Sequence, residues 1–162
     1  MNHRFAAVGI AFGAGMDTGL TADAAARVDE ELEVVAERRV GAVLRRDRDA
    51  QLAAGTSLGW MHGMPQAIKD AAETAGIPST LGSPLLADRI PKHDALMVAR
   101  MKAAGCIVVG KTNTPEFGLG SHTFNEVFGV TRNAFDGTKS AGGSSGGAAV
   151  SLATHMLPVA DG

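Results

Sequence analysis

Apolar residues recur along the chain in patterns that predict helices and strands. From Thr21 to about Asp49 they fall at spacings near three and four, as on one face of an amphipathic helix. Two short segments, MPQAIKD (64–70) and CIVV (106–109), are predicted to be strands. The second is the stronger case, because it is continuously apolar and rich in β-branched residues.

A helix is predicted between these strands, over ALMVARMKAA (95–104), with Asp94 as its N-terminal cap and Gly105 at its end. A further helix is predicted over GGAAVSLAT (146–154), and a last strand over MLPVADG (156–162). Alternation of strand, helix and strand predicts an α/β fold, a mixed β-sheet flanked by helices.

A long polar loop is expected from about Gly118 to Ala141. We expect the chain to divide into an N-terminal helical region, residues 1–59, and an α/β part, residues 60–162. The sequence stops at Gly162, directly after an apparent strand and with no closing element. We therefore interpret the α/β part as incomplete, the first portion of a longer domain.

Composition narrows the possible partners. The 162 residues carry a net charge of −2 with 20% charged residues, which gives no electrostatic footprint for nucleic acid or anionic lipid. No apolar run approaches the roughly 20 residues that span a bilayer, and the N-terminus lacks a convincing signal-peptide core. Cys106 is the only cysteine, which excludes a disulfide framework. These features predict a cytoplasmic protein.

The stretch KSAGGSSGGAAVSLA (139–153) has four glycines and two serines in six consecutive positions. A flexible linker is disfavoured, because the cluster runs directly into a predicted helix. Residues 142–146 also fit the nucleophile-elbow pattern G-x-S-x-G, but the polar residues before them cannot form the buried strand that this elbow requires. A phosphate cradle would need a lysine directly after the glycines, and none is there.

A phosphate-loop pattern, G-x-x-x-x-G-K-[ST], does occur at residues 105–112. Its four central residues would have to form an open loop whose N–H groups surround phosphate. Here they are CIVV, whose N–H groups we expect to bond within a sheet. We therefore treat this match as accidental.

Lys69, at the end of a predicted strand, offers a partner for the serines of the cluster. Serine becomes a nucleophile only when a base removes its proton, and a lysine kept neutral by burial can serve. The alternative is an ordinary ion pair between Lys69 and Asp70 or Glu73 at the strand end.

Three motifs together resemble the amidase signature family of serine amidases. They are GMPQAIKD (63–70), AAGCIVVGKTNTPEFGLG (103–120) and FGVTRNAFDGTKSAGGSSGGAAVSLA (128–153), and the resemblance runs from about Trp60 to Gly162. It implies an amidase-signature fold and hydrolysis of a carboxylic amide through an acyl-enzyme.

The resemblance also implies site residues. Lys69 corresponds to the catalytic lysine, and Ser144 to the family's serine that follows a cis peptide bond, here Gly143–Ser144. The nucleophilic serine and the oxyanion-hole amides would lie beyond Gly162. Ser145 is expected to support the hydrogen bonding of the site.

Further expectations follow from the same family. Gly118 and Gly120 would lie in a loop beside the acyl-binding pocket, with a purely structural turn as the alternative. Lys111 and Asn113 would hold structure near the site. No metal and no cofactor are implied. The substrate would be a small-molecule amide, and the simple amidases fit better than the glutamyl-tRNA amidotransferase branch.

The alternatives are a truncated pseudoenzyme or a subunit completed by a second chain. We also expect either a homodimer or association with the missing C-terminal half.

Overall fold

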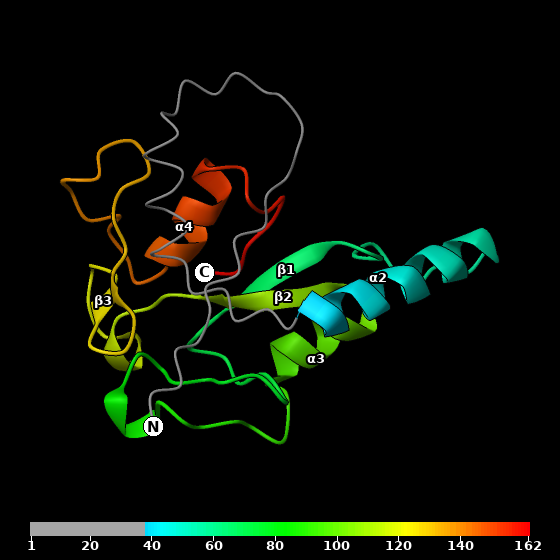
Figure 1. Cartoon of the computed structure of the whole chain (residues 1–162), viewed down its shortest axis with the longest axis horizontal. Helices are drawn as coiled ribbons and strands as arrows, with labels where there is room; N and C mark the ends of the chain where they lie inside the picture. The colour runs from blue at the N-terminus through cyan, green and yellow to red at the C-terminus, as the bar shows by residue number, and fades with distance from the viewer. Residues whose placement is uncertain (1–37) are drawn as a thin grey trace.

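Two parallel strands lie at the centre of the structure, a computed structural model that describes residues 38–162 (Figure 1). β1 (Pro65–Lys69) pairs with β2 (Ile107–Thr112), with Lys69 opposite Thr112 and an irregular step between Gln66 and Ala67. Both predicted strands are confirmed, and β2 continues beyond CIVV to Thr112. Parallel strands are typically buried on both faces, which explains their mostly apolar sequences.

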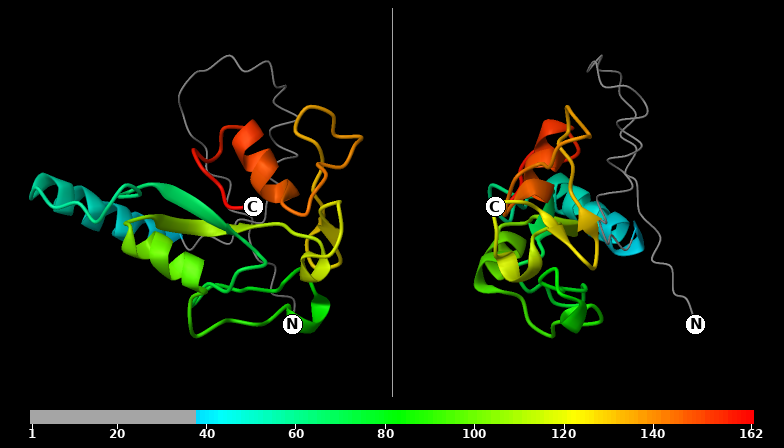
Figure 2. Two further views of the ribbon diagram at one scale, coloured as in Figure 1. Left: turned by 180° about the vertical axis from the view of Figure 1, so that it is seen from behind. Right: turned by 90° about the vertical axis from the view of Figure 1, so that its left-hand side faces the viewer.

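Helices cover the two strands. α3 (Leu96–Ala103) lies on one side of the pair and α4 (Gly146–Ala153) on the other, as the two rotated views also show (Figures 1 and 2). α2 (Arg38–Ala53) packs beside β2, and its far end projects away from the body. The fold class is therefore confirmed as α/β, represented here by part of a fold.

The helix predicted from Thr21 to about Asp49 is confirmed where the structure describes it, and it continues to Ala53 as α2. Its first part, residues 21–37, lies outside the described residues. The expected division between residues 1–59 and 60–162 stays a prediction.

The cap expected for α3 is wrong. The residue at the helix start is Ala95, and no side chain bonds the first turn. The Asp94 carboxylate instead accepts hydrogen bonds from the Ala75 N–H at 2.8 Å and the Lys102 ammonium at 2.7 Å. A cation and a loop amide compete for this carboxylate more strongly than the helix end does. Gly105 follows the helix, as predicted, with φ of 99°.

The long polar loop is interrupted by two very short strands. β3 (Phe124–Asn125) pairs antiparallel with β4 (Gly129–Val130). Strands of two residues are too short to show alternation of apolar and polar positions, so the sequence gives no sign of them. Two single 3-10 turns, η1 (Pro84–Leu86) and η2 (Glu116–Gly118), complete the described elements.

The strand predicted over residues 156–162 is also wrong. These residues lie outside every strand of the described chain and form no ladder with any of them. Asp161 instead reaches the end of β1 through its side chain.

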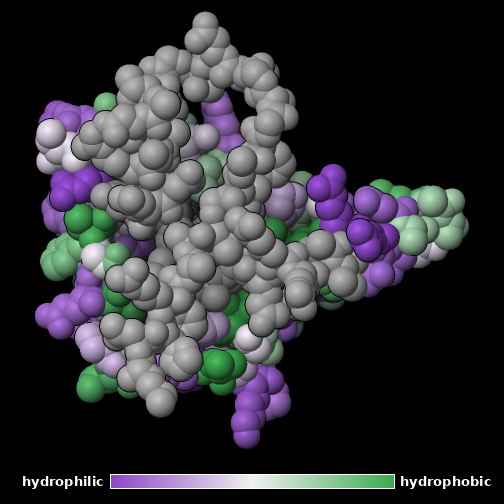
Figure 3. Space-filling view, in the orientation of Figure 1, coloured by the Kyte–Doolittle hydropathy of each residue, from purple (hydrophilic) through white to green (hydrophobic). Residues whose placement is uncertain are grey.

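The apolar core is small, and apolar side chains are prominent on the surface. Ile68 of β1 and Val98 of α3 are fully buried, whereas five large side chains are more than two thirds exposed: Trp60, Leu85, Leu96, Leu119 and Phe135. Hydrophobic patches show at several separate places in Figure 3, while the projecting part of the molecule has polar side chains along its middle and apolar ones at its tip. Within residues 38–162, no helix has the length and apolarity needed to cross a membrane.

Candidate active site

Lys69 and the two central serines of the Gly/Ser cluster meet in the fold. The Lys69 Nζ donates hydrogen bonds to the Ser144 Oγ at 2.8 Å and to the Ser145 Oγ at 2.7 Å. The lysine ends β1, and the serines form the turn that leads into α4, 75 residues later. The carboxyl end of a parallel strand is where ligands bind in α/β folds.

Burial shifts the protonation of Lys69 toward the neutral amine. Desolvation lowers the pKa of Lys69, and the negative charge of Asp161 partly opposes this by favouring the ammonium form. As an ammonium, Lys69 has three protons to donate, and the serine hydroxyls accept two of them. As a neutral amine it keeps two protons and gains a lone pair, so one of these hydroxyls can donate to it. This group of atoms can therefore pass a proton from serine to lysine.

Close packing holds the Gly/Ser turn. A Cβ on Gly147 would lie 2.5 Å from the Asn113 main-chain nitrogen, and one on Gly146 would overlap the Thr123 side chain. Only glycine allows the backbone to approach so closely. The Gly143–Ser144 peptide bond is cis. The cluster is thus packed backbone, which excludes the flexible linker.

Asp161 lies at the site but is not predicted from the sequence. Both of its carboxylate oxygens accept hydrogen bonds from the Lys69 main-chain N–H, each at 3.0 Å, and Oδ1 also accepts one from the Gln66 side-chain amide at 3.3 Å. The only signal in the sequence is an acidic residue after the apolar MLPVA. Its proximity to a lysine 92 residues earlier depends on the fold.

Comparison with known proteins decides the family. The family model described as Amidase matches residues 18–162. The chain belongs to the amidase family.

Individual proteins that this chain resembles support the same family. An Acidothermus cellulolyticus protein, named as one subunit of glutamyl-tRNA(Gln) amidotransferase, is 47% identical over 114 residues, which are 70% of this chain and 23% of that protein. The structure of a peptide amidase from Stenotrophomonas maltophilia matches with a TM-score of 0.72 at 28% identity, covering 88% of this chain and 32% of that one. A 6-aminohexanoate cyclic dimer hydrolase matches with a TM-score of 0.70 at 32% identity, covering 90% and 29%. The chain spans about a quarter of the length of the curated relatives it matches.

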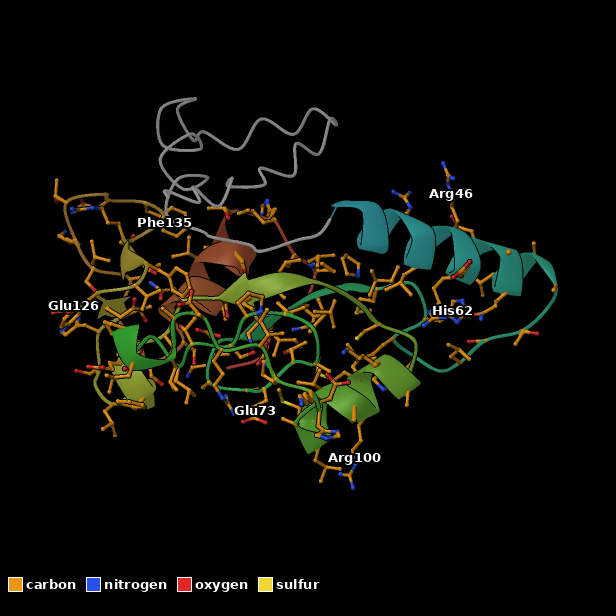
Figure 4. The ribbon with its side chains drawn as sticks, turned by 60° about the horizontal axis from the view of Figure 1, so that its bottom comes forward. Arg46, His62, Glu73, Arg100, Glu126 and Phe135 are labelled. Atoms are coloured by element: carbon orange, nitrogen blue, oxygen red, sulfur yellow. The ribbon has the colours of Figure 1, made fainter. Side chains whose placement is uncertain are left out.

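Lys69 forms an ion pair with neither Asp70 nor Glu73, so the alternative prediction for this lysine is wrong. Asp70 is buried, accepts hydrogen bonds from the Thr80 hydroxyl and main-chain N–H, and pairs with Lys111 at 3.5 Å. Glu73 pairs with Arg89. Figure 4 shows Glu73 at the surface, on the same side of the molecule as Arg100 and opposite Arg46.

The structure of residues 105–112 excludes a phosphate-binding loop. Three of its four central residues, Ile107, Val108 and Val109, belong to β2, and Lys111 is only 4% exposed. The Lys111 ammonium donates to the Ala72 carbonyl at 2.5 Å and to the Ser79 hydroxyl at 3.0 Å. Desolvation lowers the pKa of Lys111, and Asp70 opposes this. The lysine therefore ties the strand end to the 72–80 loop and cannot reach a phosphate.

Asn113 links β2 to the β3–β4 hairpin. Its side-chain amide donates to the Thr131 hydroxyl at 3.0 Å, and its Oδ1 accepts a hydrogen bond from Asn125 at 2.6 Å. Both Asn113 and Lys111 thus hold structure beside the site, in line with the sequence analysis.

The glycines expected near an acyl pocket lie in a loop apart from the Lys69–Ser144–Ser145 cluster. Gly118 ends η2 with φ of 73°, and Gly120 has φ of 127°. Neither makes a hydrogen bond to the three clustered residues, so their role in binding substrate stays a prediction. Among residues 38–162, no group of three or more His, Cys, Asp or Glu side chains could hold a metal ion.

Proposed function

We propose that this chain supplies the general base and the proton relay of an amide hydrolase that works through an acyl-enzyme. The observation that carries the proposal is the hydrogen bond from the Lys69 Nζ to the Ser144 Oγ at 2.8 Å. A desolvated lysine in direct contact with a serine hydroxyl is the pairing that activates a nucleophile at neutral pH.

The proton path then has three steps. A nucleophilic serine attacks the amide carbon while its proton passes to the Ser144 Oγ and the Ser144 proton passes to the neutral Lys69 Nζ. When the C–N bond breaks, the lysine returns a proton through Ser144 to the leaving amine. Water then attacks the acyl-serine ester and passes a proton through Ser144 to the Lys69 Nζ. When the ester C–O bond breaks, this proton returns through Ser144 to the oxygen of the nucleophilic serine, which releases the carboxylic acid and restores neutral Lys69.

The nucleophilic serine is proposed to come from the residues that follow Gly162 in the complete protein. A Cβ built on Gly162 would lie 3.2 Å from the Ser145 Oγ, so this residue is in direct contact with the serine turn. The residues that come next along the chain would start beside Lys69 and Ser144. The oxyanion-hole amides are proposed to come from the same segment.

The substrate is proposed to be a small-molecule carboxylic amide, bound beside Gly118, Gly120 and Ser145 by a protein of the cytoplasm. Relatives bearing the names peptide amidase and 6-aminohexanoate cyclic dimer hydrolase support amide chemistry. The amidotransferase branch is the second candidate, because the curated relatives carry that name and are called subunits. An amidotransferase would use the same lysine and serines to release ammonia from an amide donor.

The third candidate is a catalytically inactive chain that associates with another polypeptide. The exposed apolar side chains, among them Leu119 and Phe135, favour association with the rest of the domain or with a second copy. Sedimentation of the 162-residue chain over a range of concentrations tests this. We expect dimers or larger species, and a monomer at all concentrations would exclude the homodimer.

The test of the catalytic proposal is amide hydrolysis by the protein as its source organism makes it, together with its intact mass. We expect the Lys69→Ala variant to lose at least about 10²–10⁴-fold in kcat while its fold is retained. Lys92→Ala is the matched control, because Lys92 is exposed and distant from the site in sequence. Near-normal turnover by Lys69→Ala would exclude Lys69 as the base.

A further inference from the structure

We infer that Thr123 is a positioning residue that holds Ser144 and Ser145 against Lys69, an inference that rests on the proposed function. Thr123 lies in the loop before β3 and is completely buried. It belongs to none of the motifs that suggested the site from the sequence.

Thr123 bonds the Gly/Ser turn at three points. Its main-chain N–H donates to the Gly142 carbonyl at 2.9 Å. Its hydroxyl accepts a hydrogen bond from the Gly146 N–H at 2.8 Å and donates one to the Ser144 carbonyl at 3.4 Å. These bonds fix the backbone before, within and after the pair of serines.

Thr123 is itself held in place through its main-chain carbonyl. Its carbonyl accepts a hydrogen bond from the Thr131 N–H at 2.9 Å, and the Ala141 N–H bonds the Thr131 carbonyl at 3.0 Å. The loop, the residue that follows β4 and the start of the Gly/Ser turn thus form one bonded unit. Movement of the turn would require this unit to open.

The shape of the turn matches the threonine side chain. A Cβ on Gly143 would lie 2.7 Å from the Thr123 Oγ1, and one on Gly146 would overlap the same side chain. The glycines on both sides of the two serines therefore leave the space that the Thr123 hydroxyl occupies. This contact explains why glycine flanks the serines on each side.

The consequence for the site is geometric. The two serine hydroxyls lie 2.8 and 2.7 Å from the Lys69 Nζ, and they belong to the segment that Thr123 fixes. Without the Thr123 hydroxyl, the buried Gly146 N–H loses its acceptor, and a buried unpaired donor is costly. The turn would shift to pair that N–H elsewhere and would carry the serine hydroxyls away from the lysine.

The test compares two substitutions in the complete enzyme. Thr123→Val keeps the shape of the side chain and removes the hydroxyl, while Thr123→Ser keeps the hydroxyl. We expect Thr123→Val to lower kcat by about 10- to 100-fold with KM within about twofold, and Thr123→Ser to restore kcat to within about threefold. Thr138→Val is the control, because the Thr138 hydroxyl is exposed and bonds only Asp136.

A second readout is independent of amide hydrolysis. Competitive acetylation, followed by mass spectrometry, measures the reactivity of each lysine amine in the folded protein. Thr123→Val should change the reactivity of Lys69 relative to Lys92, and Thr123→Ser should leave this ratio unchanged. Suppose that Lys69→Ala retains turnover while Thr123→Val still changes the acetylation of Lys69 relative to Lys92. In that case the proposed function would fail, and the positioning role of Thr123 would stand.

Two results would overturn the inference. One is a folded Thr123→Val protein with unchanged kcat and unchanged Lys69 reactivity. The other is a Thr123→Ser protein that loses as much kcat as Thr123→Val, since the hydroxyl would then be irrelevant.

If Thr123→Val does not fold, hydrogen exchange of the unsubstituted protein tests the bond between Thr123 and Gly146. We expect the Gly146 amide to be protected, and exchange as fast as in an exposed loop would exclude the bond to Thr123.

Discussion

The Asp161 carboxylate accepts hydrogen bonds from the Lys69 main-chain N–H through both oxygens, each at 3.0 Å. This contact fixes the backbone of the proposed base and places a negative charge beside its side chain. Desolvation lowers the pKa of Lys69 while that charge acts in the opposite direction. The protonation of the base is therefore a balance between burial and one carboxylate.

Replacement of that carboxylate should change the pH profile of the enzyme. Catalysis requires neutral Lys69, so kcat/KM should rise with pH through the pKa of this lysine. Asp161→Asn removes the charge that raises the pKa, which leaves desolvation unopposed. We expect the rising limb of the profile to move to lower pH, alongside a loss of kcat from the weakened contact with the Lys69 N–H.

Asp136→Asn is the matched control for this measurement, because Asp136 is paired with Lys139 at the surface. Its profile should coincide with that of the unsubstituted enzyme. A limb that moves to higher pH in Asp161→Asn would contradict the electrostatic role given to Asp161.

The two serines should differ in their contributions to catalysis. Ser144→Ala removes the proton relay, and we expect kcat to fall by about 10²–10⁴-fold. Ser145→Ala removes only a hydrogen bond to the lysine, and its effect should be smaller, about 10- to 100-fold. Steady-state kinetics with an amide substrate measures both, with the exposed Ser57→Ala as control. If Ser145→Ala lost more activity than Ser144→Ala, Ser145 would be the proton relay and Ser144 the supporting residue.

The close approach at Gly147 should be visible in stability. Helix propensity alone favours alanine over glycine by about 0.5–1 kcal/mol. In α4, however, the added methyl would lie 2.5 Å from the Asn113 main-chain nitrogen, and relief of this overlap should cost about 1–3 kcal/mol. Thermal unfolding of Gly147→Ala should therefore show a lower Tm.

Gly137→Ala provides the matched comparison, since no atom lies within 4 Å of its Cβ position. We expect its Tm to stay the same or to rise slightly. A stabilised Gly147→Ala protein would show that the contact with Asn113 relaxes without cost.

The buried pair of Asp70 and Lys111 should be strongly coupled. The side chains of both residues are at most 3% exposed, and the charged atoms lie 3.5 Å apart. Asp70→Asn or Lys111→Met alone leaves one buried charge without its partner and should cost about 3–5 kcal/mol. The double variant should cost clearly less than the sum of the two, as measured by urea unfolding. Additive losses would show that the two charges do not interact.

The sequence predicts well those parts of the fold that local pattern determines. β2 follows from a continuous apolar run, α4 from the apolar residues after the glycines, and Lys69 from a lysine at a strand end. The choice of Ser144 among the serines of the cluster rests on the family resemblance. The partner of Asp94 was not predicted correctly. The first amides of α3 and the Lys102 ammonium compete for its carboxylate, and only the fold shows that the ammonium binds it. Local pattern gives no information about such competition.

The missed site residues share one physical cause. Asp161 and Thr123 act through contacts with residues far away in the sequence, at separations of 92 and 23 residues. Neither lies in a pattern that distinguishes it from ordinary acidic or hydroxyl residues of loops. The roles proposed for them rest on three-dimensional proximity alone.

The distance along the chain between the lysine and its serines has a consequence for biosynthesis. Lys69 leaves the ribosome 75 residues before Ser144, a delay of roughly 4–15 s at usual elongation rates. During that time the lysine lacks the neighbours that exclude water from it, so it remains an ordinary charged side chain. The desolvation that lowers the pKa of Lys69 therefore arises only when the distant segments have docked, late in the synthesis of this part of the chain.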